Sequence, residues 1–136
     1  MYRTIFENTG TATIISEADT TIALANSHFQ RLSGYSRKEL QEKKSWTEFI
    51  ARVDLEKMLH YHSVRRTNPT GAPKNYEIKF VDRHGNVRDI FITVDVIPGT
   101  KKSVLSFMDI TELKEAEREV RELNEELEKR VRERTA

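Results

Sequence analysis

The sequence predicts an α+β fold in which a five-stranded antiparallel sheet carries short helices on one face and is followed by a long C-terminal helix. Two β-branched segments, residues 11–16 and 20–24, lie on either side of a short polar turn. Apolar and polar residues alternate over residues 76–80 and 87–97, as in half-buried strands. From Leu113 onward, apolar residues recur every third or fourth position among Glu, Lys and Arg, which is the helical period. This order of elements favours an antiparallel sheet with helices on one face.

The composition limits the class of protein. The formal net charge of the 136-residue chain is +1 at pH 7, so no strong global field attracts nucleic acid or an anionic membrane. The chain has no cysteine, which excludes disulfides, thiolate metal sites and a flavin attached through cysteine. No apolar run approaches the ~20 residues of a membrane-spanning helix, and the polar N-terminus does not resemble a signal peptide. We therefore expect a cytoplasmic protein.

The first part of the chain predicts a hairpin and short helices. Residues 2–8 favour a short helix, and a turn at residues 17–19 joins the two β-branched segments as a β-hairpin. Asn26 can cap a helix over residues 27–32, because its short side-chain oxygen can accept from a free N–H of the first turn. Gly34 has the place expected just past the end of that helix.

Further helical segments are expected before the second half of the sheet. Ser36 and Glu39 have capping-box spacing, which predicts another short turn that carries Leu40. Residues 46–50 predict one more short apolar helix, and residues 54–66 predict a longer one. A loop rich in Pro and Gly follows.

The two alternating segments predict a second hairpin, with Gly85 at its bend. The long strand over residues 87–97 has one uniformly apolar face, which belongs on the core. That face carries Ile90, Ile92, Val94 and Val96. The other face is mixed, with Phe91 and Ile97 among polar residues, so we expect it to be open or partly covered.

The final strand, residues 103–108, runs into the long helix through a joint without Gly or Pro. Asp109 or Thr111 can cap this helix, and Asp109 has capping-box spacing to Glu112. Such a joint can transmit a displacement of the strand to the helix. The sequence thus divides into a domain over residues 1–111 and a helix over residues 112–136, which we expect to lead into a downstream domain of a longer protein.

Apolar residues of the C-terminal helix have the 3-4-3-4 spacing of a coiled-coil seam. The seam residues are Leu113, Ala116, Val120, Leu123, Leu127 and Val131. The last step skips Arg130, and such a stutter locally changes the supercoil. We expect a homodimer, preferably parallel, through this helix and the mixed sheet face. The alternative is a single amphipathic helix folded back on the sheet.

Four stretches in order along the chain resemble the PAS domain, the sensory box of sensor histidine kinases and related signalling proteins. They are Tyr2–Asn8 with Gly10-Thr11-Ala12, Asn26-x-x-Phe29-x-x-Leu32-x-Gly34-Tyr35-Ser36-x-x-Glu39-Leu40, Arg83–Val87, and Asp109–Glu112. The departures are Ser27 in place of the usual Pro, Val53-Asp54 in place of Asp-Asp, and His84 in place of Lys-Asp.

The resemblance implies a sensor or interaction module with no chemistry of its own. Family members hold a small molecule, or nothing, between the helices and the core face of the sheet. They relay a signal through the terminal motif, here Asp109-Ile110-Thr111, into a coiled coil. The resemblance also implies an ion pair between Asp109 and a basic residue, for which Arg83 and Lys79 are candidates.

A set of mostly apolar residues is expected to face such a pocket. The candidates are Phe29, Leu32, Phe49, Met58, Leu59, His62, Ile78, Phe80, Ile92 and Val94. The alternative is that they simply fill a small core, as most apolar residues on element faces do. His60 and His62 occupy the helix where haem-binding relatives carry an axial histidine, but residues two apart on a helix face apart. Haem is therefore disfavoured, no metal site is expected, and the sequence requires no cofactor.

No nucleophile elbow, Gly-rich phosphate loop or pair of carboxylates stands out, so we expect no catalytic activity. The basic residues of the C-terminal helix alternate with acids, which argues against nucleic-acid binding. The expected function is to sense a small ligand or partner and relay the signal to a dimeric coiled coil that regulates a histidine kinase. Two alternatives stay open: a ligand-free dimerisation and protein-interaction module, and a haem or flavin redox sensor.

Overall fold

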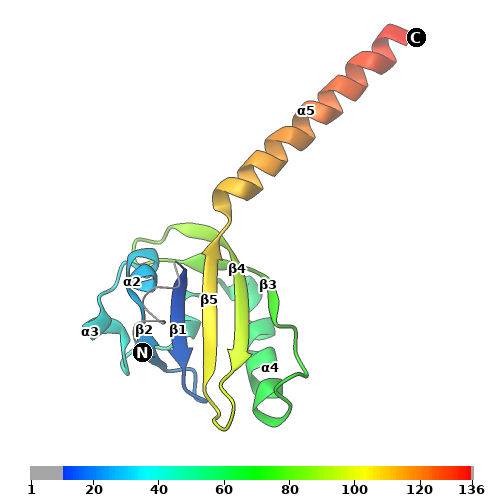
Figure 1. Ribbon diagram of the computed structural model, residues 1–136. Coiled ribbons are helices and arrows are strands. Elements are labelled where there is room, and N and C mark those ends of the chain that lie inside the picture. Colours follow the sequence, from blue (N-terminus) through cyan, green and yellow to red (C-terminus); the bar gives the residue numbers. More distant parts are fainter. Residues whose placement is uncertain (1–10, 136) are drawn as a thin grey trace.

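The computed structural model describes residues 11–135, and the side chains of residues 11–132. These residues form an antiparallel sheet with helices behind it and a long helix that leaves its end (Figure 1). The five strands have the order β2-β1-β5-β4-β3. They are β1 (Ala12–Ser16), β2 (Ile22–Ala25), β3 (Asn75–Val81), β4 (Val87–Val96) and β5 (Ser103–Asp109). The predicted fold class is confirmed, and the helix predicted at residues 2–8 lies outside the described residues.

Three short helices and one longer helix connect β2 to β3. They are α2 (Ser27–Ser33), α3 (Arg37–Leu40), the 3-10 helix η1 (Trp46–Phe49) and α4 (Arg52–Thr67). Asn26 caps α2 as predicted, since its Oδ1 accepts from the Phe29 N–H at 3.0 Å. The same buried oxygen accepts from Thr13 N–H at 3.0 Å, so the cap also fixes α2 against β1. The predicted capping box between Ser36 and Glu39 forms at the start of α3.

The core lies between the sheet and these helices. Its sheet side includes Ile90, Ile92 and Val94 of β4, all buried as the alternation predicts. Four phenylalanine rings pack across the layer, with centroids of contacting rings 5.2 to 6.0 Å apart. They are Phe29 of α2, Phe49 of η1, Phe80 of β3 and Phe107 of β5. These contacts join the helices to the sheet at its central strand, β5.

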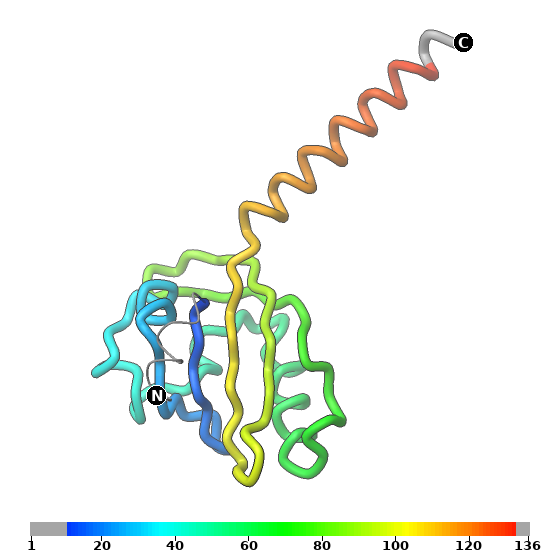
Figure 2. Tube along the Cα trace, viewed as in Figure 1, coloured from blue at the N-terminus to red at the C-terminus, as the bar shows by residue number. Residues whose placement is uncertain are grey.

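The last helix, α5 (Thr111–Thr135), extends away from the sheet (Figure 2). Its 25 residues span roughly 37 Å at 1.5 Å per residue. The seam side chains of Leu113, Val120, Leu123, Leu127 and Val131 are 56% to 61% exposed. The alternative in which this helix folds back on the sheet is therefore wrong for this structure. Within residues 11–135, none of the helices combines the length and the hydropathy that a membrane span requires.

Candidate functional site

The joint between β5 and α5 is the first candidate site. Leu105 and Phe107 of β5 point into the core, so Asp109 follows them on the same face. Its side chain lies at the end of the core and is 34% exposed. Asp109 Oδ1 accepts from the Thr111 backbone N–H at 3.0 Å and from the Thr111 hydroxyl at 2.6 Å. Asp109 therefore satisfies a free N–H at the start of α5, through Thr111 rather than Glu112.

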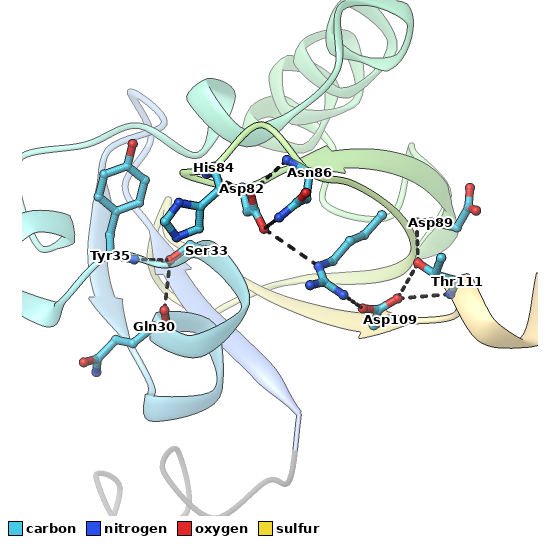
Figure 3. A network of polar contacts seen from close by, with 10 residues as sticks. Gln30, Ser33, Tyr35, Asp82, His84, Asn86, Asp89, Asp109 and Thr111 are labelled. Carbon is cyan, nitrogen blue, oxygen red and sulfur yellow. Dashed lines mark hydrogen bonds and ion pairs between the residues drawn. The ribbon is translucent and has the colours of Figure 1, made fainter.

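The joint is also bonded to β4. The backbone N–H of Asp89 donates to Thr111 Oγ1 at 2.9 Å, and the Asp89 carbonyl accepts from the Ile110 N–H at 2.8 Å. The Ile110 side chain is buried. Because Thr111 bonds both Asp109 and Asp89, the first turn of α5 is fixed to two adjacent strands at once (Figure 3).

The ion-pair partner of Asp109 is Arg88, and the prediction of Arg83 or Lys79 is wrong. Arg88 Nη1 lies 3.0 Å from Asp109 Oδ2. The strand register explains this, since Asp109 lies opposite Ile90 and Arg88 is the diagonal neighbour on the same face. Lys79 lies directly opposite Asp89 on the other face and pairs with it, whereas Arg83 pairs with Glu39 of α3.

The contacts of Asp109 with Thr111 and Arg88 determine whether its carboxyl group is ionised. Burial acts to raise the pKa of Asp109, but the hydrogen bonds from Thr111 and the Arg88 guanidinium outweigh it and hold that pKa below its ordinary value. Asp109 is therefore ionised at neutral pH, so the cap of α5 and its ion pair with β4 coexist.

A further ion pair links the base of α5 to β3. Lys114 Nζ lies 2.6 Å from Glu77 Oε2. β3 is at the edge of the sheet, two strands away from β5. The first turn of α5 thus contacts three strands, namely β5 through the chain itself, β4 through Asp89 and Arg88, and β3 through Glu77.

Most of the predicted pocket residues meet in the core. Phe29, Phe49, Met58, Ile78, Phe80, Ile92 and Val94 belong to its buried cluster, and Leu32 packs against it. Leu59 does not, because it is 40% exposed. The inward face of α4 is instead formed by Leu55, Met58 and His62, which leaves Leu59 toward solvent. The phenylalanine rings in this cluster contact one another directly.

His62 is buried and bonded within the fold. Its Nε2 lies 2.8 Å from the Ala18 carbonyl oxygen, which can only accept, so Nε2 carries the proton. Its ring lies edge-on to Trp46, with centroids 5.5 Å apart. Trp46 Nε1 donates to Ser16 Oγ at 3.0 Å. His62 therefore ties α4 to the β1–β2 turn, whereas His60 is exposed. No group of three or more His, Cys, Asp or Glu residues suited to a metal ion occurs within residues 11–135.

Sequence reasoning missed Arg88, Glu77 and Lys114 as members of the joint. Arg88 is detectable only after β4 and β5 are aligned, because its role depends on a cross-strand diagonal. Lys114 resembles any other charged residue of α5 until the helix is placed above β3. The seam residues are all on α5, with Ala116 exposed as well, and their pairing with a second copy stays a prediction.

Comparison with known proteins agrees with this architecture. Residues 1–110 match the PAS fold family. No curated protein matches the sequence. Among solved structures, a sensory box histidine kinase/response regulator from Burkholderia thailandensis E264 is similar with a TM-score of 0.66 and 20% identity, over 94% of this chain and 98% of that one.

Two other structures are similar over most of their length. A domain of the sensory box sensor histidine kinase/response regulator from Geobacter sulfurreducens has a TM-score of 0.64 and 20% identity, over 79% of this chain and 90% of that one. The PAS domain of a protein from Colwellia psychrerythraea has a TM-score of 0.70 and 17% identity, over 82% and 95%. Because the family match spans residues 1–110, including all five strands, this chain belongs to the PAS family.

Proposed function

We propose that this chain is a non-catalytic sensory module that relays a displacement of its sheet through Asp109, Ile110 and Thr111 to α5. The observation that carries the proposal is the set of bonds at the joint. Asp89 exchanges two hydrogen bonds with Ile110 and Thr111, and Arg88 pairs with Asp109. A shift of β4 against β5 therefore alters the base of α5 directly.

Pairing of α5 with a second copy is the second part of the proposal. Its seam leaves Leu113, Leu123 and Leu127 more than half exposed. Burying each such side chain against a partner helix would contribute roughly 1.5–3 kcal/mol, whereas an exposed ion pair such as Glu126–Arg130 contributes about 0.3–0.5 kcal/mol. The apolar term favours a helix pair over a lone helix.

We propose that such a module acts on a downstream output domain of a longer protein. Similarity to solved structures of sensory box histidine kinase/response regulators supports a kinase as that domain. The stutter at Arg130 supplies two nearly equivalent helix packings, which is the kind of two-state element that a relay needs.

The test compares two aspartates in the full-length protein. Asp109→Ala removes the cap and the ion pair of the joint, while Asp95→Ala removes an exposed ion pair with Lys74 elsewhere on β4. We expect Asp109→Ala to change kinase autophosphorylation and Asp95→Ala to leave it unchanged. Circular dichroism should show that both variants are folded. Unchanged autophosphorylation in Asp109→Ala would rule out the relay.

A second candidate is a ligand-free dimerisation and docking module. The observation that favours it is the direct contact among Phe29, Phe49, Phe80 and Phe107, which fill the region where a ligand would lie. Native mass spectrometry with a denatured control separates the two. A dimer with an extra mass that denaturation removes supports ligand sensing, and a dimer at polypeptide mass supports the docking module.

A further inference from the structure

Arg88 lies between two carboxylates that belong to different elements. Its Nη1 is 3.0 Å from Asp109 Oδ2 at the end of β5. Its Nε is 4.0 Å from Asp82 Oδ2 in the loop that joins β3 to β4. Figure 3 shows Asp82 and Asp109 with a side chain reaching between them. One cation therefore has two anions within ion-pair distance.

The two contacts are unequal. Arg88 Nε is buried and has no hydrogen-bond partner among the described residues. A buried donor without a partner costs free energy. The Asp82 carboxylate lies just beyond hydrogen-bond distance of this atom, so a small shift of Arg88 toward the loop would satisfy Nε and weaken the bond to Asp109.

Asp82 is well placed to act as the second acceptor. Its side chain is 6% exposed. Its Oδ1 accepts from the backbone N–H groups of His84 at 2.9 Å and Asn86 at 3.0 Å. Burial acts to raise the pKa of Asp82, but these hydrogen bonds outweigh it and hold the pKa below its ordinary value. The loop therefore presents a fixed anion to Arg88.

The same loop is attached to the connection between α2 and α3. The Arg83 backbone N–H donates to the Ser33 carbonyl at 2.9 Å, and Arg83 Nη1 lies 3.2 Å from Glu39 Oε2. The Arg83 guanidinium also covers the Tyr35 ring at 4.8 Å. At Gly34, with φ of +83°, an added Cβ would lie 3.1 Å from Arg83 Cβ, so the two segments pack closely. Because of these contacts, we expect a movement of either segment to displace the other.

We propose that Asp82 competes with Asp109 for Arg88, so that the position of the β3–β4 loop sets how firmly the first turn of α5 is held. The loop then forms a second input to the joint, from the surface around Tyr35 and Glu39, besides the core. The effect on output rests on the proposed relay. The competition itself is a property of this chain and is measurable without a downstream domain.

The experiment follows amide exchange by nuclear magnetic resonance in this chain. The reporters are the N–H groups of Thr111, bonded to Asp109, and Lys114, bonded to Ile110. In Asp82→Asn, Arg88 is left to Asp109 alone, and we expect exchange at both amides to slow about two- to fivefold, the size of a partly exposed ion-pair effect. Asp95→Asn serves as the matched control and should change neither rate.

A background without the cation separates competition from simple repulsion between the two aspartates. In Arg88→Gln, the further change Asp82→Asn should no longer slow exchange at Thr111. An equal slowing in both backgrounds, or none in either, would overturn the proposal. Asp109→Asn gives an independent readout if the Asp82→Asn variant does not fold. In Asp109→Asn, the Arg88 Nε–H should form a hydrogen bond with Asp82 and exchange more slowly with water. An unchanged Nε–H signal would contradict the competition.

The outcomes for the two proposals are distinct. Unaltered autophosphorylation in Asp109→Ala would remove the relay and leave the shared Arg88 in place. Unaltered amide exchange in Asp82→Asn, or an unaltered Nε–H signal in Asp109→Asn, would remove the competition and leave the relay in place.

Discussion

The domain and α5 differ in how their apolar residues are satisfied. In the domain, side chains such as Phe29, Phe80 and Ile92 are fully buried by contacts within the chain. In α5, the seam leucines and valines remain more than half exposed. The domain therefore buries its own core, whereas the apolar side chains of α5 are left exposed for the proposed pairing with another helix. The joint between them is held mainly by directional polar contacts at Asp109 and Thr111.

The largest effect is expected from opening the core. Phe29 is fully buried and its ring contacts three others, so Phe29→Ala should lower the free energy of unfolding by about 3–5 kcal/mol. Leu59→Ala on exposed α4 surface is the control and should change it by about 0.5 kcal/mol or less. Urea denaturation measures both. Similar losses in the two variants would contradict the placement of Leu59 outside the core.

The next effect concerns the seam. Leu123→Ala removes an apolar side chain from each helix of the proposed pair and should weaken dimerisation at least about tenfold. The free energy of unfolding of the domain should stay unchanged. Arg118→Ala, off the seam, is the control and should keep the dimer. Sedimentation velocity over a dilution series measures the association, and a wild-type chain that stays monomeric at micromolar concentration would contradict the seam.

A smaller effect is expected at the joint. Thr111→Val keeps the shape of the side chain but removes its hydrogen bonds with Asp89 and Asp109, at a cost of about 1 kcal/mol. Thr100→Val removes comparable bonds in the β4–β5 hairpin. Both variants should lose stability in thermal unfolding, but only Thr111→Val should speed amide exchange in the first turn of α5. Equal amide exchange rates in the two variants would contradict the claim that the Thr111 side chain stabilises the first turn of α5.

The smallest effect is a pH dependence at His62. Burial lowers the pKa of His62, and the positive charges of Arg66 and Arg65 lower it further. The hydrogen bond to the Ala18 carbonyl and the charge of Asp19 raise it, but they do not outweigh burial. The unfolded chain therefore takes up this proton at a higher pH than the folded chain. The stability contributed by neutral His62 is complete above its ordinary pKa and is lost as pH falls toward the lowered folded value.

Trp46 reports on this transition, since it is the only tryptophan and its ring contacts His62. The urea midpoint from its fluorescence should fall as the pH is lowered through this range. In His62→Gln, whose amide can still donate to Ala18, this part of the pH dependence should vanish. A pH dependence identical to the wild type would assign it to other groups.

Much of the domain could be predicted from the sequence because its signals are local. The alternation in β4, the cap at Asn26 and the capping box at Ser36 each depend on residues within a few positions of one another. The start of α4 was less clear, since Ala51 caps it without a side-chain hydrogen bond. The helix begins at Arg52, two residues before the predicted start. The prediction missed this start because Ala51 has no side-chain oxygen that could mark it as a cap.

The site was harder to predict because its contacts are distant in sequence. Arg88 and Asp109 are 21 residues apart and meet only through the register of β4 and β5. His62 and Ala18 are 44 residues apart. On α4, the inward positions include His62 and Arg65, so an apolar pattern alone wrongly selected Leu59. Three-dimensional placement, rather than residue type, determined these contacts.

The coupling between the sheet and α5 is the central claim, and a distance between paired helices tests it most directly. The chain has no cysteine, so Glu125→Cys places one spin label on each copy of α5. Pulsed electron paramagnetic resonance would then measure the distance between labels with and without Asp109→Ala. We predict a narrow distribution in the chain with Asp109 and a shifted or broadened one without it. Identical distributions would contradict the claim that the joint sets the arrangement of the helices.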